Sequence, residues 1–206
     1  MAPLVYLASR SPRRRELLLQ IGVPHKLLDI EVDESPRDGE SPSDYVQRVS
    51  QDKAVAGLNA RKAGEYLPVL AADTCVVIDG LMLGKPRDRD EGIWMLQQLS
   101  GRMHEVYTAV ALDNGQLETR LSVSQVSFRP MTPVEIAKYW ERGEPADKAG
   151  GYAIQGLAAM FINDLRGSYS GVMGLPLFET AELLSRAGIE LLSITNNNKL
   201  RNAKEV

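Results

Sequence analysis

Two polar residues interrupt a long apolar run in the middle of the chain. The run extends from Val69 to Ile78, and Asp73 and Thr74 lie at its centre. An ionised carboxylate inside a buried strand is costly unless it is paired, hydrogen-bonded or bound to a metal. Asp73 is therefore a candidate metal ligand or a candidate base that takes a proton from an attacking water. A structural aspartate that caps a turn or pairs with an arginine is the alternative.

Three consecutive arginines, Arg13, Arg14 and Arg15, lie where a helix is predicted to begin. Ser11 is a good N-cap, and Pro12 suits the first helical position. Each arginine in this positively polarised first turn is unfavourable by roughly 0.3–1 kcal/mol at an exposed site, so a bound anion is expected there. Because successive helical side chains are about 100° apart, Arg13 and Arg14 are expected to face that anion and Arg15 the solvent.

Lys53 lies on the apolar face of a helix predicted for residues 42 to about 63, where apolar residues recur at helical spacing. A lysine in this position either reaches a ligand or snorkels, with its stem packed and its ammonium in water. Glu34 lies in the acidic loop before this helix. It is either part of a site or an ordinary solvated side chain.

Lys85 follows a predicted β-hairpin. Asp79-Gly80 is a strong signal for a two-residue turn, so residues 81–84 should return antiparallel to the preceding strand. This register would place Thr74 opposite Lys85, about 5 Å apart at the backbone. Lys85 would then lie at the same end of the hairpin as Asp73. Strict alternation puts the two side chains on opposite faces, so a direct contact between them stays open.

Together these residues predict a site for a polyphosphate and a divalent cation. In such sites arginines and lysines neutralise phosphate oxygens, carboxylates hold Mg²⁺ or Mn²⁺, and one carboxylate can accept a proton from water. The chain has no GxxxxGKS/T loop and no GxGxxG loop after a strand, and neither histidine has a zinc or triad spacing. In the glycine-rich segment 148–156, Lys148 and Gln155 could reach a ligand.

The whole-chain composition limits the class of protein. A chain of 206 residues with 44% hydrophobic residues suits one domain, here residues 1–190, and the net charge of −3 makes nucleic-acid binding unlikely. The single cysteine, Cys75, excludes an internal disulfide. There is no apolar run long enough for a membrane span and no signal-peptide pattern, so the cytoplasm is expected. The polar tail, residues 191–206, is expected to fray.

The predicted elements interleave strands and helices without strict βαβ alternation, which favours a mixed sheet with helices on its faces. The predicted strands cover residues 5–8, 27–32, 69–78, 81–84, 104–112, 116–128 and about 159–164. The predicted helices cover residues 12–21, 42–63, 89–100, 133–143 and 177–187.

The motifs resemble the Maf family of nucleoside triphosphate pyrophosphatases, in order and spacing, over residues 4–187. They are Ser9-Arg10-Ser11-Pro12-Arg13-Arg14, Glu34, Lys53 within QDKA, Ala72-Asp73-Thr74, Gly84-Lys85-Pro86-Arg87, Asp147-Lys148-Ala149-Gly150, Ile154-Gln155-Gly156 and Gly174-Leu175-Pro176. The resemblance implies an elongated α/β fold similar to inosine triphosphate pyrophosphatases. That fold has a mixed β-sheet flanked by helices and two lobes with a central cleft.

The resemblance also implies an activity and assigns roles. The activity is hydrolysis of a nucleoside triphosphate to the monophosphate and pyrophosphate, with Mg²⁺ or Mn²⁺ as the divalent metal cofactor. Asp73 would accept the proton and bind metal, with Glu34 as a metal or water ligand. The implied ligands of the substrate are Ser11, Arg13, Arg14, Lys53, Thr74, Lys85 and Gln155. A homodimer is common in the family.

Three positions divide the family by substrate. Relatives that act on 7-methyl-GTP have tryptophan in place of Arg13, glutamine in place of Thr74 and glutamate in place of Gln155. The residues present here match the subgroup that acts on dTTP and UTP, which implies removal of surplus or modified pyrimidine nucleotides. One alternative is a non-catalytic regulator that binds nucleotide or nucleic acid, because the family is also associated with septum formation. The other is a phosphatase or kinase acting on the γ-phosphate.

Overall fold

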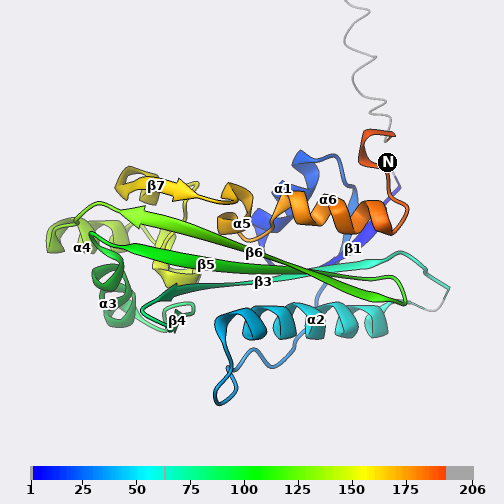
Figure 1. Ribbon diagram of the computed structural model, residues 1–206, viewed down its shortest axis with the longest axis horizontal. Helices are drawn as coiled ribbons and strands as arrows, with labels where there is room; N and C mark the ends of the chain where they lie inside the picture. Colours follow the sequence, from blue (N-terminus) through cyan, green and yellow to red (C-terminus); the bar gives the residue numbers. More distant parts are fainter. Residues whose placement is uncertain (1, 63, 194–206) are drawn as a thin grey trace, which may run out of the picture.

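A seven-stranded mixed sheet forms the body of an elongated molecule in the computed structural model, which describes residues 2–62 and 64–193 (Figure 1). The strand order is β2-β1-β3-β5-β6-β7, and β4 pairs with β3 outside this path. The strands are β1 (Val5–Ala8), β2 (His25–Leu28), β3 (Val69–Ile78), β4 (Leu81–Leu83), β5 (Met103–Asp113), β6 (Leu117–Phe128) and β7 (Ile162–Arg166). The parallel pairs are β1 with β2 and β1 with β3, and the other pairs are antiparallel.

Helices cover both faces of this sheet, as the interleaved pattern predicted. Helix α2 lies along one face, α1, α5 and α6 lie along the other, and α3 and α4 lie at one end of the long strands (Figure 1). The helices are α1 (Pro12–Gln20), α2 (Pro42–Ala60), α3 (Arg89–Leu99), α4 (Pro133–Glu141), α5 (Tyr169–Met173) and α6 (Leu177–Arg186). Short 3-10 helices are η1 (Glu144–Asp147), η2 (Ala149–Gly151), η3 (Leu157–Phe161) and η4 (Leu191–Ser193).

The two largest hydrophobic clusters lie in different parts of the long sheet. One packs α3 and α4 against the sheet and includes Leu96, Phe128 and Ile136. The other packs α1 and α6 against the sheet and includes Leu18 and Leu183. Each cluster is fully shielded from water at its centre, so the molecule has two packed regions that share the strands β3 and β5.

The outer edge of β3 is open between these two regions. On that edge, β1 pairs with Val69 and Leu70, and β4 pairs with residues 76–78. On the opposite edge, β5 pairs with β3 continuously from Val69 to Val77. Within the described chain, residues 71–75 therefore have a strand neighbour on one side only. Asp73 and Thr74 lie in this gap.

Several predicted boundaries were wrong, and two of them are set by residues distant in the sequence. The predicted strand 27–32 is β2 at His25–Leu28, because its partner β1 ends at Ala8, opposite Leu28. The predicted strand near 159–164 begins only at Ile162, because the Glu144 carboxylate accepts two backbone N–H groups and holds the preceding residues in η3. Helix α2 ends at Ala60.

Two other segments depart from the prediction. Helix α5 was not predicted, since five residues are too few for a periodic pattern. The tail expected to fray from residue 191 starts with η4, Leu191–Ser193, and residues 194–206 lie outside the described residues.

Gly57 lets α2 lie close to the sheet, which yields a prediction about stability. A Cβ at this position would lie 2.7 Å from Val69 Cγ1 and 3.2 Å from Ala8 Cβ, both fully buried. Glycine to alanine normally favours a helix, but overpacking a core typically costs about 1–3 kcal/mol. We expect Gly57→Ala to lower the free energy of unfolding by that amount in urea denaturation. Asn59→Ala, at an exposed position of the same helix, is the control and should be neutral or slightly stabilising.

Candidate active site

A cavity of about 860 Å³ lies at the open edge of β3. Nine of the residues that line it are the predicted site residues: Ser11, Arg13, Arg14, Glu34, Lys53, Asp73, Thr74, Lys85 and Gln155. They come from β3 and from segments on both faces of the sheet. The fold thus brings every predicted site residue to one place.

The Asp73 carboxylate of β3 is held by a lysine of α2, the helix that packs on one face of the sheet. Asp73 is 5% exposed and Lys53 is 8% exposed, and Lys53 Nζ lies 2.8 Å from Asp73 Oδ1. Lys53 reaches this carboxylate because it lies on the face of α2 that packs on β3. The alternative of a snorkelling lysine is therefore wrong, since the ammonium is buried and paired. Burial raises the pKa of Asp73 above its ordinary value, although the Lys53 and Arg14 cations oppose this effect.

Glu34 converges on the same ammonium from the loop before α2. Its Oε1 lies 2.9 Å from Lys53 Nζ, and its side chain is about half exposed. Partial burial acts to raise the pKa of Glu34, but the Lys53 ammonium, with Lys85 and Arg14 nearby, lowers it below the ordinary value. Two carboxylates with oppositely shifted pKa values therefore share one lysine.

The expected pairing of Thr74 with Lys85 across the hairpin does not form. The turn at Asp79-Gly80 has the predicted geometry, with positive φ at both residues, but β4 ends at Leu83, opposite Val76. Thr74 instead pairs with Thr108 of β5, on the other edge of β3. Lys85 lines the cavity from beyond the end of β4 and is exposed. The cation that contacts Asp73 is Lys53.

The arginines at the start of α1 separate as helical geometry predicted. Arg13 and Arg14 line the cavity, whereas Arg15 is exposed and lies outside it. Arg13 Nη1 lies 3.8 Å from Asp147 Oδ2, in the 3-10 helix η1. Ser11 occupies the N-cap position, but its side chain makes no capping hydrogen bond. The first turn of α1 thus presents uncapped N–H groups and two guanidinium groups to the cavity.

The loop that carries Glu34 is fastened to α2 by two residues that the sequence did not single out. The Tyr45 hydroxyl donates to the Glu34 carbonyl at 3.0 Å, and Arg48 Nη2 donates to the Ser35 carbonyl at 3.0 Å. Arg48 also binds both carboxylate oxygens of Glu40, at 2.6 and 2.8 Å. These contacts join residues 8 to 13 positions apart, so no periodic pattern in the sequence signals them.

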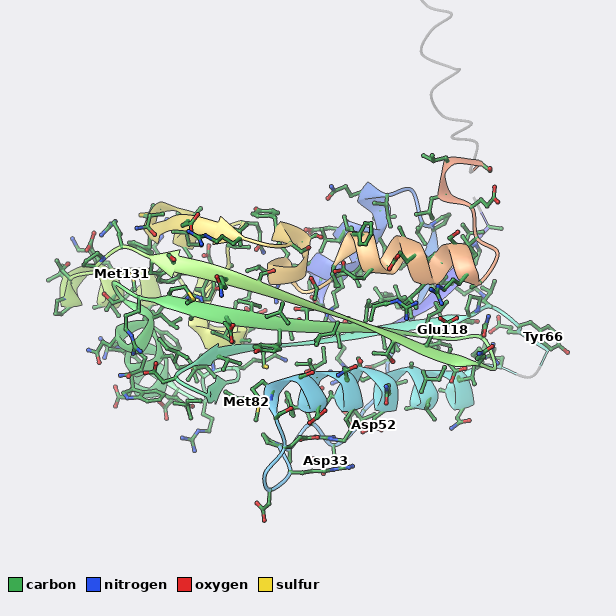
Figure 2. The ribbon with its side chains drawn as sticks, in the orientation of Figure 1. Asp33, Asp52, Tyr66, Met82, Glu118 and Met131 are labelled. Carbon is green, nitrogen blue, oxygen red and sulfur yellow. The ribbon has the colours of Figure 1, made fainter. Side chains whose placement is uncertain are left out.

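Figure 2 shows how this loop lies against the rest of the molecule. Asp33 lies in the loop beneath α2, and Asp52 projects from the same side of the helix, away from the long strands. Met82 of β4 lies near the beginning of α2, where it packs against the cluster that contains Val46 (Figure 2). The loop and β4 therefore flank α2 close to the end of the helix from which Tyr45 and Arg48 project.

The glycine-rich segment closes the opposite side of the cavity. Gly150 and Gly151 have positive φ angles of 66° and 69°, and a Cβ on Gly150 would lie 2.9 Å from Val76 Cγ2. These glycines therefore form a tight turn against β3. Lys148 contacts Asp147 and also lines the cavity. Gln155 is exposed at the cavity wall, and no hydrogen bond joins its side chain to any described residue.

The carboxylates at Lys53 fit a divalent cation that is shared with a substrate. Residues 2–62 and 64–193 contain no group of three or more histidine, cysteine, aspartate or glutamate side chains arranged to hold a metal. Mg²⁺, however, is usually bound through only one or two carboxylates, with substrate phosphates and water completing the shell. Asp73 and Glu34 meet that smaller requirement, because both reach the same Lys53 ammonium.

The arrangement has the chemistry of a polyanion site. Six cationic side chains line one cavity in a chain with a net charge of −3: Arg10, Arg13, Arg14, Lys53, Lys85 and Lys148. Asp73 supplies a buried carboxylate beside them. No helix in the described part of the chain is long and apolar enough to cross a membrane.

The chain is similar to several known proteins. The sequence model of a family described as "Maf-like protein" matches residues 4–187. The chain is 55% identical to a dTTP/UTP pyrophosphatase of Alkalilimnicola ehrlichii, over 91% of this chain and 95% of that protein. It is 54% identical to a dTTP/UTP pyrophosphatase of Saccharophagus degradans, over 87% of each chain. A solved structure of a nucleoside-triphosphatase (dITP/XTP pyrophosphatase) from Mycobacterium abscessus aligns with a TM-score of 0.47 at 18% identity, over 94% of this chain and 98% of that one.

The raised pKa of Asp73 predicts a pH-dependent effect of Asp73→Asn on stability. A carboxyl group whose pKa is raised on folding stabilises the fold fully below its unfolded pKa, and this stabilisation is lost as pH rises through the folded pKa. Asparagine does not ionise. We therefore expect the variant to gain stability relative to the wild type as pH rises from 3.8, the ordinary value, towards neutrality. Urea denaturation in EDTA at several pH values measures this difference.

Asp38→Asn, at an exposed position of the Glu34 loop, is the control for this series and should show no such gain. If the wild type instead became relatively more stable as pH rises, the Lys53 ammonium would outweigh burial. The pKa of Asp73 would then be lowered, and the prediction would be wrong.

Proposed function

The chain belongs to the Maf family, and from this premise we propose that it hydrolyses dTTP and UTP to the nucleoside monophosphate and pyrophosphate. The observation that carries the proposal is Asp73, a buried carboxylate in a cavity lined by six cationic side chains. Such a cavity suits a triphosphate, whose oxygens the cations neutralise, together with a base for the attacking water. The curated relatives of this chain that are named dTTP/UTP pyrophosphatase support the substrate class.

In the proposed reaction, a water oxygen attacks the α-phosphorus of the nucleotide and the bond from this phosphorus to the bridging oxygen breaks. Asp73 accepts the proton of the water, and pyrophosphate leaves. Burial supports this role because it raises the pKa of Asp73 and so makes the carboxylate a stronger base. Lys53 orients that carboxylate through its contact with Oδ1.

The cations have separate parts in the proposal. Arg13 and Arg14 bind phosphate oxygens together with the N–H groups at the start of α1, next to Ser11. Lys53 and Lys85 stabilise the charge that develops as pyrophosphate leaves. Both lysines line the cavity, Lys53 from α2 and Lys85 from the segment after β4.

A divalent cation, Mg²⁺ or Mn²⁺, belongs to this proposal as cofactor. Asp73 and Glu34 would hold it. When bound, the cation would polarise the phosphate oxygens and neutralise developing charge. Tyr45 and Arg48 would keep Glu34 in reach by fastening its loop to α2. We also propose that the protein acts in the cytoplasm. The homodimer that is common in the family stays a prediction.

Gln155 is the residue that we propose recognises the base of the nucleotide. Its amide can donate to O4 of thymine or uracil while its carbonyl accepts from N3–H. An amide that is free to turn by 180° could present the reverse pattern to cytosine. Thr74, one candidate to fix the amide, is instead engaged with Arg14 and Thr108. A backbone group of the segment 148–156 is the remaining candidate to fix the amide once the base is bound.

Product analysis tests the proposed reaction. Incubated with dTTP and Mg²⁺, the protein should release dTMP and pyrophosphate in equal amounts, EDTA should stop the reaction, and added Mg²⁺ or Mn²⁺ should restore it. Asp73→Asn should fold and lose turnover by roughly 10²–10⁴-fold, because an amide cannot accept the proton. Arg15→Ala, outside the cavity, is the control and should keep wild-type turnover.

Each failure of this assay has its own meaning. Orthophosphate in place of pyrophosphate would indicate a phosphatase, and transfer of the γ-phosphate would indicate a kinase. Tight nucleotide binding without any product would favour a regulator. Full turnover in EDTA would contradict the proposed metal dependence but not the proposed reaction.

A panel of nucleotides tests the proposed base preference. We expect dTTP and UTP to exceed CTP, GTP and 7-methyl-GTP by roughly tenfold or more in kcat/KM, because a wrong base leaves buried polar groups unpaired. Gln155→Glu should weaken the preference for dTTP, because a carboxylate cannot donate to O4. Gln97→Glu, an exposed glutamine of α3 outside the cavity, is the control. Equal rates on all nucleotides, or a preference for 7-methyl-GTP, would contradict the assignment.

A further inference from the structure

We infer that Thr108 is a positioning residue for Arg14. Thr108 is fully buried in β5 and does not line the cavity. Its hydroxyl nevertheless joins two of the three groups that hold the Arg14 guanidinium, namely Thr74 and the helix α5 with Gly174 at its end. The inference rests on the proposed function, because it takes Arg14 to be a ligand of the substrate.

The Arg14 guanidinium is held by three contacts. Nε donates to the Gly174 carbonyl at 2.7 Å, Nη2 to Thr74 Oγ1 at 3.2 Å, and Nη1 to Ser9 Oγ at 3.4 Å. A guanidinium has five N–H groups, and these contacts use one on each nitrogen. One N–H therefore remains on each terminal nitrogen. Two such N–H groups match the geometry in which arginine binds a phosphate with two parallel hydrogen bonds.

The Thr108 hydroxyl lies between Thr74 and the helix α5. Thr108 Oγ1 is the donor in two contacts, at 2.8 Å from the Gly171 carbonyl and at 3.0 Å from Thr74 Oγ1. Thr74 Oγ1 also accepts from Arg14 Nη2, because a guanidinium can only donate. Thr108 thus links the Gly171 carbonyl to the oxygen that receives the Arg14 hydrogen bond.

Thr108 also holds the second support of Arg14, the helix α5. Gly171 lies inside α5, and Gly174, which ends the helix with a φ of 113°, carries the carbonyl that accepts from Arg14 Nε. A Cβ on Gly174 would lie 3.5 Å from both Arg14 Nε and Thr74 Oγ1. One hydroxyl thus contacts both Thr74 and α5, two of the three supports of the guanidinium, and its loss would weaken both together.

Matched variants test this role. Thr108→Val removes the hydroxyl and keeps the shape, and we expect the KM for dTTP to rise roughly tenfold, with a smaller change in kcat, because binding is what Arg14 supplies. Thr108→Ser keeps the hydroxyl and should stay within about twofold of wild type. Thr180→Val is the control, since it also removes a fully buried threonine hydroxyl that donates to a carbonyl, that of Pro176 at 2.7 Å. It should lower the melting temperature and leave KM unchanged.

A double-mutant cycle and an NMR measurement separate positioning from general stability. In an Arg14→Gln background, Thr108→Val should add little to the rise in KM, because the group it positions is gone. In the wild type, the Nε–H of Arg14 should exchange with water much more slowly than that of exposed Arg15, and Thr108→Val should remove this protection. If the valine variant does not fold, Thr108→Ala takes its place.

The inference is overturned if Arg14 Nε–H exchanges as fast as that of Arg15 in the wild type. It is also overturned if Thr108→Val leaves both protection and KM unchanged, if Thr108→Ser is impaired as much as Thr108→Val, or if Thr180→Val raises KM equally. The exchange measurement does not depend on turnover. A wild type without pyrophosphatase activity would therefore contradict the proposed function while the NMR result still decides the role of Thr108.

Discussion

The carboxylate of Asp73, buried in the sheet, is the constraint on which the rest of the site depends. A buried charge needs an opposite charge close by, and only Lys53 comes within 2.8 Å of it as an ion-pair partner in the described chain. Lys53 reaches the carboxylate because α2 packs closely on the sheet, where Gly57 leaves no side chain between the helix and Val69. The same helix then fastens the Glu34 loop through Tyr45. The buried carboxylate thus requires the close packing of α2, and α2 in turn holds the loop that carries the second carboxylate, Glu34.

The open edge of β3 explains how one strand serves both faces of the sheet. Asp73 and Thr74 are consecutive, so their side chains point to opposite faces. Both still line the cavity, because no strand of residues 2–62 and 64–193 covers this edge between β1 and β4. Asp73 is held from the α2 side by Lys53, and Thr74 contacts Arg14 from the α1 side. Cations from the two helix layers therefore meet at this gap. A continuous sheet would keep them apart.

Local patterns in the sequence predicted most strands and helices, and buried polar residues in apolar runs pointed to the site. What they could not predict depends on partners distant in the sequence. The end of β2 is set by β1, and η3 is held by Glu144. The pairing of Lys53 with Asp73 needed the packing of α2. Thr108 did carry a signal, since it interrupts the apolar part of β5 as Asp73 interrupts β3. No pattern in the sequence indicated that Arg48 fastens the Glu34 loop.

The strength of each ion pair varies with its depth in the cavity, and this gradient suits a site that must admit a polyanion. Arg13 contacts Asp147 at 3.8 Å, and the Asp147 side chain is 66% exposed, so water screens the contact and it contributes little. A phosphate can replace Asp147 at small cost. Lys53, by contrast, is buried and contacts two carboxylates, those of Asp73 and the half-exposed Glu34, so an incoming phosphate would have to compete with both. The outer cations are therefore free to bind a polyanion, while Lys53 keeps the Asp73 carboxylate in place.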